Sequence, residues 1–99
     1  MTETVSIVIG SESDLDLANK CSETLDSLSI SNSIQVLSAH RTPALLETHI
    51  RECEAGGTKV FNAMAGLAAH LAGAVASKTV LPVIGVPGGG GPVRGMVAR

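Results

Sequence analysis

Short apolar runs alternate along this chain with segments of helical periodicity. Residues 4–9, TVSIVI, are largely β-branched and nearly continuous in apolarity, as expected of a parallel strand that is covered on both faces. From Ser13, a predicted N-cap, apolar residues recur at helical spacing, at Leu17, Cys21, Leu25 and Leu28. This segment therefore predicts a strand, a turn and a helix.

The same alternation continues to residue 86. Residues 33–37 predict a second strand, and Thr42 with Pro43 predicts the start of a helix that ends at Gly56 and Gly57. The inward stripe of this helix is Leu46, Ile50 and Cys53. The remaining predicted elements are a third strand over 58–64, a third helix over 67–78 and a fourth strand over 81–86.

Strands that alternate with helices over short connections favour one topology. Right-handed crossovers between such strands produce a parallel sheet layered by helices, so we expect an α/β fold. Every strand-to-helix loop then emerges at the carboxyl edge of the sheet, where open α/β sheets bind their ligands.

Composition supports one domain. A chain of 99 residues with 44% apolar content suffices for one compact core, which we expect to occupy residues 1–87. Phe61 is the single aromatic residue, so aliphatic side chains, alanine and glycine must fill that core. The composition changes at residues 88–99, GGGGPVRGMVAR, which predict a Gly/Pro-rich C-terminal tail.

Charge and hydropathy argue against several classes of partner. The formal charge is -2 and the basic residues are spread along the chain, so we expect no nucleic-acid partner. The longest apolar stretch, 63–76, is shorter than the ~20 residues that cross a bilayer, so we expect no membrane association. The N-terminus lacks a signal-peptide pattern, and Cys21 and Cys53 lack CxxC spacing, which favours the cytoplasm.

Three loops are predicted to meet at the carboxyl edge, at residues 10–14, 38–42 and 65–71. In the first, the Ser11 and Ser13 hydroxyls, backbone N–H groups and a helix N-terminus suit a phosphate or carboxylate. Asp14 could accept hydrogen bonds from sugar hydroxyls. For this loop alone, simple capping of the helix by Ser13 and Asp14 is the favoured alternative.

The second loop places a histidine beside an arginine. Arg41 can bind an anion in a bidentate manner, and His40, like histidine side chains in general, can both donate and accept a proton at neutral pH. A surface histidine before a helix is the alternative, but the pairing at a ligand-binding edge favours function. His49, beside Glu47 and Arg51 in mid-helix, is expected on a solvated face.

The third loop consists almost entirely of glycine and alanine, so a compact planar group could approach its backbone closely. The alternative is tight packing of residues 63–76, with another subunit as the second cover. His70 is then either a core histidine or part of a pocket. No metal is expected, since His40, His70 and a cysteine lack ligand spacing, and the G-x-S-x-G motif of serine hydrolases is absent.

These motifs carry a family resemblance. GSESD, SAHRTP, AGLAAHLAG and LPVIGVP, in this order and spacing, resemble the class I N5-carboxyaminoimidazole ribonucleotide mutases of purine biosynthesis, over residues 5–87. Arg41 after His40, with GLAAHL further on, favours this class over the related aminoimidazole ribonucleotide carboxylases that use free carbon dioxide. The combination of SAHRTP with AAHL is far more specific than a lone glycine motif.

The resemblance implies a flavodoxin-like three-layer α/β/α sandwich, assembled as a homo-octamer with active sites at subunit contacts. It implies an isomerase that moves the carboxyl group of N5-carboxyaminoimidazole ribonucleotide from N5 to C4, giving 4-carboxy-5-aminoimidazole ribonucleotide. No metal, ATP or organic cofactor is implied.

The resemblance also implies roles for individual residues. His40 would be the general acid and base. Phosphate, ribose and carboxylate would be bound by Ser11, Ser13, Asp14 and Arg41, with Ser38 and Ala39 lining the pocket. The loop that retains carbon dioxide would contribute Ala65, Gly66, Ala69, His70 and Leu71.

The sequence departs from the family pattern at two places. Ala72 stands where a proline usually follows the His-Leu pair, and residues 88–99 stand where the family continues with a further strand and a long helix. Activity is therefore expected to depend on how the shortened C-terminal part is compensated. A non-catalytic phosphate- or nucleotide-binding module and the carboxylase are the alternative functions.

Overall fold

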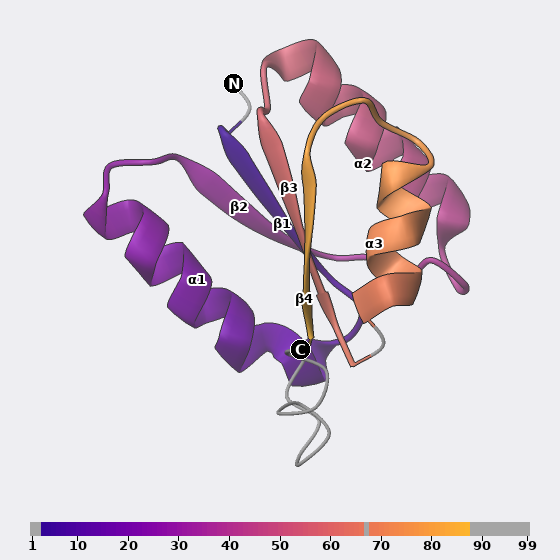
Figure 1. Cartoon of the computed structure of the whole chain (residues 1–99), viewed down its shortest axis with the longest axis horizontal. Helices are drawn as coiled ribbons and strands as arrows, with labels where there is room; N and C mark the ends of the chain where they lie inside the picture. Colours follow the sequence, from indigo (N-terminus) through magenta and orange to yellow (C-terminus); the bar gives the residue numbers. More distant parts are fainter. Residues whose placement is uncertain (1–2, 67, 88–99) are drawn as a thin grey trace.

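Four strands and three α-helices alternate along the part of the chain that the computed structural model describes, residues 3–66 and 68–87 (Figure 1). The predicted tail, 88–99, lies outside it. In chain order the elements are β1 (Val5–Ile9), the 3-10 helix η1 (Glu12–Asp14), α1 (Leu15–Ser27), β2 (Asn32–Val36), α2 (Pro43–Gly56), β3 (Val60–Ala65), α3 (Ala68–Ala76) and β4 (Val83–Pro87).

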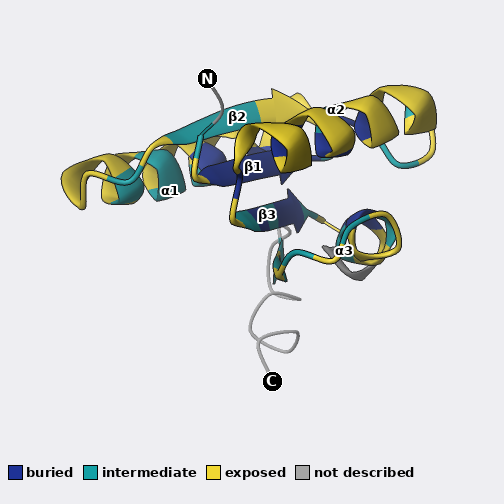
Figure 2. Cartoon of the chain, turned by 90° about the horizontal axis from the view of Figure 1, so that it is seen from above, coloured by how far each residue is buried: buried dark blue, intermediate teal, exposed yellow. Residues whose placement is uncertain are grey.

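The strands form one parallel sheet in the order β2-β1-β3-β4. Helix α1 packs on one face, and α2 and α3 pack on the other (Figures 1 and 2). The predicted α/β fold, a three-layer sandwich of the flavodoxin-like type, is confirmed. The connection from β1 to β2 runs over one face of the sheet, and the connection from β2 to β3 runs over the other. The order in which the chain adds strands to the sheet therefore reverses at β1. Such a switch point is where open α/β sheets bind ligands.

Two apolar clusters, one on each face, hold the helices to the sheet. The larger joins Val8 and Phe61 of the sheet to Leu46 and Ile50 of α2 and to Val75 of α3. The smaller joins residues of β1 and β3 to Ala18 of α1. All five residues of β1 are buried, which agrees with its nearly continuous apolar sequence (Figure 2).

Helix α2 ends where the glycine pair predicts. Its C-cap, Gly57, has φ 104°, in the left-handed region that glycine enters without the steric cost of a Cβ. The Gly57 N–H donates to the Cys53 carbonyl, which closes the last turn. Pro43 occupies the first turn of α2, also as predicted.

The start and the end of α1 differ from the prediction. Ser13 does not cap α1, because it lies within η1 and its hydroxyl is hydrogen-bonded to that of Ser11, with an Oγ–Oγ distance of 2.6 Å. Leu28 is 63% exposed rather than inward-facing, since α1 ends at Ser27 and the chain then turns, with Ser29 at φ 60°, toward β2. Ala18, which the predicted stripe omits, is the fully buried residue of α1.

The prediction of a solvated face for His49 is wrong. Its Nε2 lies 2.7 Å from Oγ of the fully buried Ser6, and Cys53 Sγ lies 3.4 Å from the same nitrogen. The inward face of α2 is wide enough to turn His49 toward β1, where the serine hydroxyl satisfies the ring. Burial lowers the pKa of His49, against the charges of Glu3 and Glu52, and burial raises the pKa of the Cys53 thiol.

Helix α3 is covered on one side. Leu71 and Val75 are buried against the sheet, while Gly73 and Ala76 are exposed. The expected second cover, another subunit, stays a prediction. Within residues 3–66 and 68–87, no helix has the length and apolarity needed to cross a membrane.

Candidate active site

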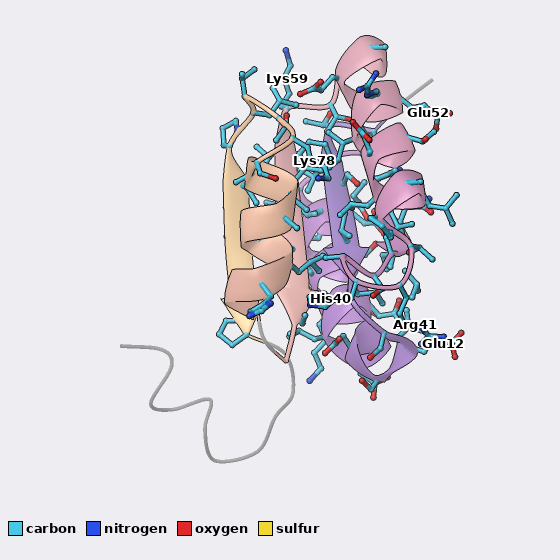
Figure 3. All side chains as sticks on the ribbon, turned by 90° about the vertical axis from the view of Figure 1, so that its right-hand side faces the viewer. Glu12, His40, Arg41, Glu52, Lys59 and Lys78 are labelled. Carbon is cyan, nitrogen blue, oxygen red and sulfur yellow. The ribbon has the colours of Figure 1, made fainter. Side chains whose placement is uncertain are left out.

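The three predicted loops meet at the carboxyl end of the sheet. Gly10 follows β1, residues 38–42 follow β2, and Ala65 ends β3. Figure 3 shows Glu12, His40 and Arg41 together at this end, with Lys59 at the opposite end. The backbone N–H of Gly10 donates to the Met64 carbonyl at 3.1 Å, which fixes the first loop to the end of β3.

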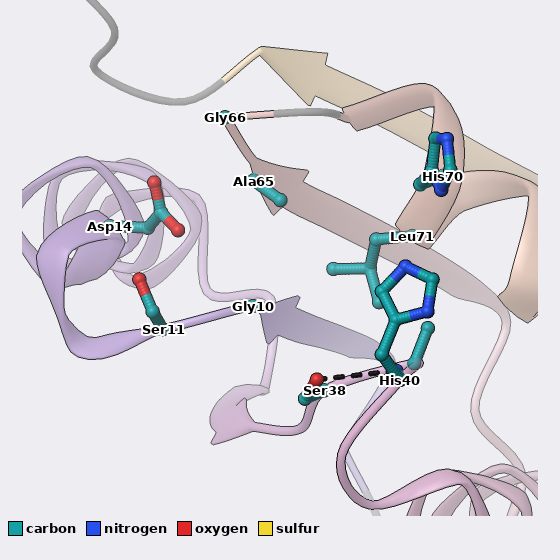
Figure 4. Close-up of a pocket in the computed structure, with 10 residues that line it drawn as sticks. Gly10, Ser11, Asp14, Ser38, His40, Ala65, Gly66, His70 and Leu71 are labelled. Atoms are coloured by element: carbon teal, nitrogen blue, oxygen red, sulfur yellow. Dashed lines mark hydrogen bonds between the residues drawn. The ribbon is translucent and has the colours of Figure 1, made fainter.

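A cavity of about 230 Å³ lies between these loops (Figure 4). His40 and His70 line it from one side, Asp14 and Ser11 from the η1 side, and Gly66 from the end of β3. It combines two imidazoles and a carboxylate with walls of alanine, glycine and leucine. This set can exchange protons with a small planar ligand.

A second cavity, of about 310 Å³, adjoins the first and shares Gly10, Ser11 and Ser38 with it. Its charged lining residues are Arg41 and Glu12. A guanidinium offers paired N–H donors suited to a phosphate or carboxylate. The two cavities together therefore suit a ligand that has an anionic group at one end, beside Arg41, and a group that exchanges a proton at the other end, beside the two imidazoles.

The path of the histidine–arginine loop is fixed by hydroxyl groups. Ser38 Oγ accepts hydrogen bonds from the backbone N–H groups of His40, at 3.2 Å, and Arg41, at 3.0 Å. Thr42 Oγ1 accepts from the Ser38 N–H at 3.0 Å and donates to the Ser38 carbonyl at 3.2 Å. These bonds direct His40 into the first cavity and Arg41 into the second.

The His40 and His70 rings lie close together, with centroids 5.6 Å apart and planes inclined at 51°. Both side chains are exposed, and both line the cavity (Figure 4). His70 is therefore part of the pocket and not a core histidine, which resolves the two alternatives from the sequence.

Close packing against Ala65 explains why glycine occupies position 10. A Cβ at this position would lie 3.3 Å from Cβ of Ala65, tighter than ordinary van der Waals contact. The small residues at the ends of β1 and β3 therefore bring two loops together at the floor of the site.

Most of the predicted site residues come together. The first cavity is lined by Ser11, Asp14, Ser38, Ala39, His40, Ala65, Gly66, His70 and Leu71, and the second adds Arg41. Ser13 lines neither cavity, because its hydroxyl is directed to Ser11. Ala69 belongs to α3, but its side chain lies outside what the structure describes.

Sequence reasoning missed Gly10, Glu12, Val36 and Thr42 as lining residues. Glu12 had a signal, since it lies within the GSESD motif between two predicted ligand residues. In the described ranges, no group of three or more histidine, cysteine, aspartate or glutamate side chains is arranged to hold a metal ion.

Comparison with known proteins identifies the family of this site. The family model described as AIR carboxylase matches residues 4–98. The chain belongs to this family. The match continues through most of the segment that the sequence predicts as a tail.

The curated relatives are named as the same enzyme. A probable N5-carboxyaminoimidazole ribonucleotide mutase of Methanobrevibacter smithii is 48% identical over 87 residues, which are 88% of this chain and 26% of that protein. The N5-carboxyaminoimidazole ribonucleotide mutase of Pseudomonas aeruginosa is 46% identical over 87 residues, 88% of this chain and 53% of that protein. This chain therefore spans about half the length of the Pseudomonas aeruginosa protein and about a quarter of the Methanobrevibacter smithii protein.

Solved structures agree with the fold. PurE of Treponema denticola superposes with a TM-score of 0.83 at 29% identity, covering 93% of this chain and 59% of that one. A structure of Treponema denticola PurE2-S38D gives a TM-score of 0.86 at 28% identity, covering 97% and 61%.

Proposed function

We propose that this protein is an isomerase of purine biosynthesis. It converts N5-carboxyaminoimidazole ribonucleotide to 4-carboxy-5-aminoimidazole ribonucleotide by moving the carboxyl group from N5 to C4. The observation that carries the proposal is that nine of the twelve predicted site residues line one cavity, with Arg41 in the cavity beside it. Relatives at 42–48% identity, all named as this mutase or as a probable one, support the same activity.

The two cavities suggest how the substrate is oriented. The phosphate binds at Arg41 in the second cavity, and Ser11 and Ser38, which belong to both cavities, contact the ribose and phosphate region. Asp14, 5% exposed, faces the first cavity and accepts from ribose hydroxyls. The imidazole ring then lies beside His40.

His40 acts first as an acid and then as a base. In the first step the N5–carbon bond breaks, carbon dioxide leaves, and N5 keeps the electron pair and takes the proton of His40. In the second step C4 attacks carbon dioxide and a carbon–carbon bond forms. The proton of C4 then returns to His40, so the imidazole ends in its starting state.

The apolar lining serves to retain carbon dioxide. Ala65, Gly66 and Leu71 line the cavity beside the two imidazoles and give this part of it an apolar surface. Since carbon dioxide is small and apolar, such a site favours recapture over escape. His70 lies beside His40 and orients the reacting group within this lining.

The assembly and location are part of the same proposal. We expect a cytoplasmic homo-oligomer, an octamer by the resemblance, in which another subunit covers the exposed side of α3. We expect catalysis to need no cofactor and no metal, and we expect no nucleic-acid or membrane partner.

One assay separates this function from its alternatives. The 99-residue chain is supplied with the N5-carboxylated ribonucleotide and, separately, with the uncarboxylated ribonucleotide and bicarbonate. The proposal predicts turnover of the former in preference to the latter. The reverse preference would identify a carboxylase, and binding of the ribonucleotide without conversion of either would identify a non-catalytic module; each would overturn the proposal.

A further inference from the structure

We propose that Glu12 is a specificity-determining residue that limits the Arg41 cavity to ligands carrying a single phosphate. The inference rests on the proposed function, because it takes the Arg41 cavity as the phosphate site. It concerns a residue that none of the predicted ligand roles includes.

The first observation is the position of Glu12. Glu12 and Arg41 line the same cavity of about 310 Å³, and Figure 3 shows both side chains at the same corner of the molecule. Glu12 comes from η1 and Arg41 from the loop that precedes α2, so two separate elements bring these opposite charges to one cavity.

The second observation is that the two charges do not pair directly. In the described part of the chain, Arg51 with Glu47, at 2.9 Å, is the ion pair within 4.0 Å. The Arg41 guanidinium is therefore not occupied by Glu12 and remains available to an anion. An anion that binds there also experiences the nearby Glu12 carboxylate.

The third observation is the charge balance of the combined site. Among the described lining residues, Arg41 is the only lysine or arginine, whereas Glu12 and Asp14 contribute two carboxylates. In the Arg41 cavity itself one guanidinium stands against one carboxylate, that of Glu12, so a first phosphate group can bind at Arg41 while little net positive charge remains for a second. Each further negative charge is repelled more strongly, since the interaction energy of two charges scales with their product.

The backbone holds Glu12 at this place. The Asp14 N–H donates to the Ser11 carbonyl at 3.1 Å, and the side chains of Ser11 and Ser13 are joined on either side of Glu12. A favourable interaction with the N-terminus of the following helix is an alternative reason for an acidic residue here. Asp16, exposed in the first turn of α1 and absent from both cavities, has that role without facing the ligand.

The experiment compares Glu12→Gln with Asp16→Asn as the matched control. Dissociation constants for inorganic phosphate and pyrophosphate are measured by NMR titration in low salt. Glu12→Gln is expected to bind phosphate roughly threefold and pyrophosphate roughly tenfold more tightly than the native chain, with the difference shrinking in high salt. Asp16→Asn should keep the native ratio of the two constants.

Arg41→Ala separates this inference from the proposed function. If Arg41→Ala loses phosphate binding but Glu12→Gln keeps the native ratio or binds both probes more weakly, the role of Glu12 is refuted and the phosphate site stands. If Arg41→Ala binds phosphate as the native chain does, or if neither chain binds it, the phosphate site itself is refuted, and the inference with it.

Discussion

The imidazole rings of His40 and His70 stand 5.6 Å apart at the carboxyl end of the sheet, although 29 residues separate them in sequence. His40 reaches this position from the loop after β2, and His70 reaches it from α3. Two rings from two elements can divide two tasks. In the proposed mechanism His40 exchanges the proton, and His70 orients the reacting group.

Replacing His40 with asparagine tests the proton-transfer role. His40→Asn keeps a planar polar group of similar reach but cannot exchange a proton near neutral pH. We expect substrate binding to be retained and isomerisation to fall by at least about 100-fold, the lower range for general acid–base catalysis. The measurement is turnover of the N5-carboxylated ribonucleotide alongside its dissociation constant.

His70→Asn is the companion variant. Because His70 is given an orienting role, we expect this variant to keep part of the turnover that His40→Asn loses. Native turnover in His40→Asn would remove the acid–base role from His40. Equal losses in both variants with unchanged binding would instead assign proton transfer to the pair.

The Ser38 hydroxyl is expected to stabilise the loop that carries His40 and Arg41. Ser38→Ala removes the acceptor of two backbone N–H groups, so we expect the free energy of unfolding to fall by roughly 1 kcal/mol. Turnover should also fall, since His40 is no longer held toward the cavity. Urea denaturation measures the first effect and the substrate assay the second.

Thr48→Ala provides a control, because this exposed threonine of α2 lies outside both cavities. Its unfolding midpoint and turnover should stay close to native values. A Ser38→Ala chain with native stability and native turnover would show that the two hydrogen bonds do not hold the loop.

The sequence predicted those parts of the fold that depend on local pattern. The apolar run of β1 and the glycine after α2 have local causes, since a doubly covered strand needs continuous apolarity and a left-handed residue favours glycine. The meeting of the three loops follows from parallel topology alone. These features need no knowledge of side-chain contacts between distant residues.

The missed features depend on contacts between elements. His49 faces inward because Ser6 of β1 offers it a hydroxyl, and nothing near His49 in the sequence indicates that partner. Ser13 joins Ser11 instead of capping α1 because the chain forms a 3-10 turn first. Glu12 lies in a predicted ligand loop, but the cavity that it lines is completed by Arg41 from another loop.

The buried position of His49 predicts a loss of stability toward low pH. Burial lowers its pKa below the ordinary value of 6.5, so the unfolded chain takes up a proton at pH values where the folded chain does not. The contribution of His49 to stability is therefore greatest above pH 6.5, and it falls with decreasing pH until the lowered pKa of folded His49 is reached. Glu3 and Glu52 oppose the shift without cancelling it.

His49→Gln removes the titrating group while keeping a hydrogen-bonding side chain. We expect its urea midpoint to change less than that of the native chain between pH 7.5 and pH 5.5. His70→Gln, an exposed histidine at the other end of the sheet, is the matched control and should keep the native dependence. The explanation fails if native protein and His49→Gln show the same slope.

The exposed side of α3 predicts an interface between subunits. Gly73 is exposed, and apart from its chain neighbours and the nearby backbone of α3, no described atom lies within 4 Å of a Cβ added there, so a single folded chain can accommodate a larger side chain. In an assembly with a second copy packed against α3, a charged side chain at this position would be buried without a partner. We therefore expect Gly73→Glu to lower the solution mass measured by sedimentation, while the chain stays folded by circular dichroism.

Ala55→Glu, a similar change on the exposed side of α2, should keep the native mass. An unchanged mass in Gly73→Glu, or a native chain that sediments as a monomer, would show that α3 is not the interface.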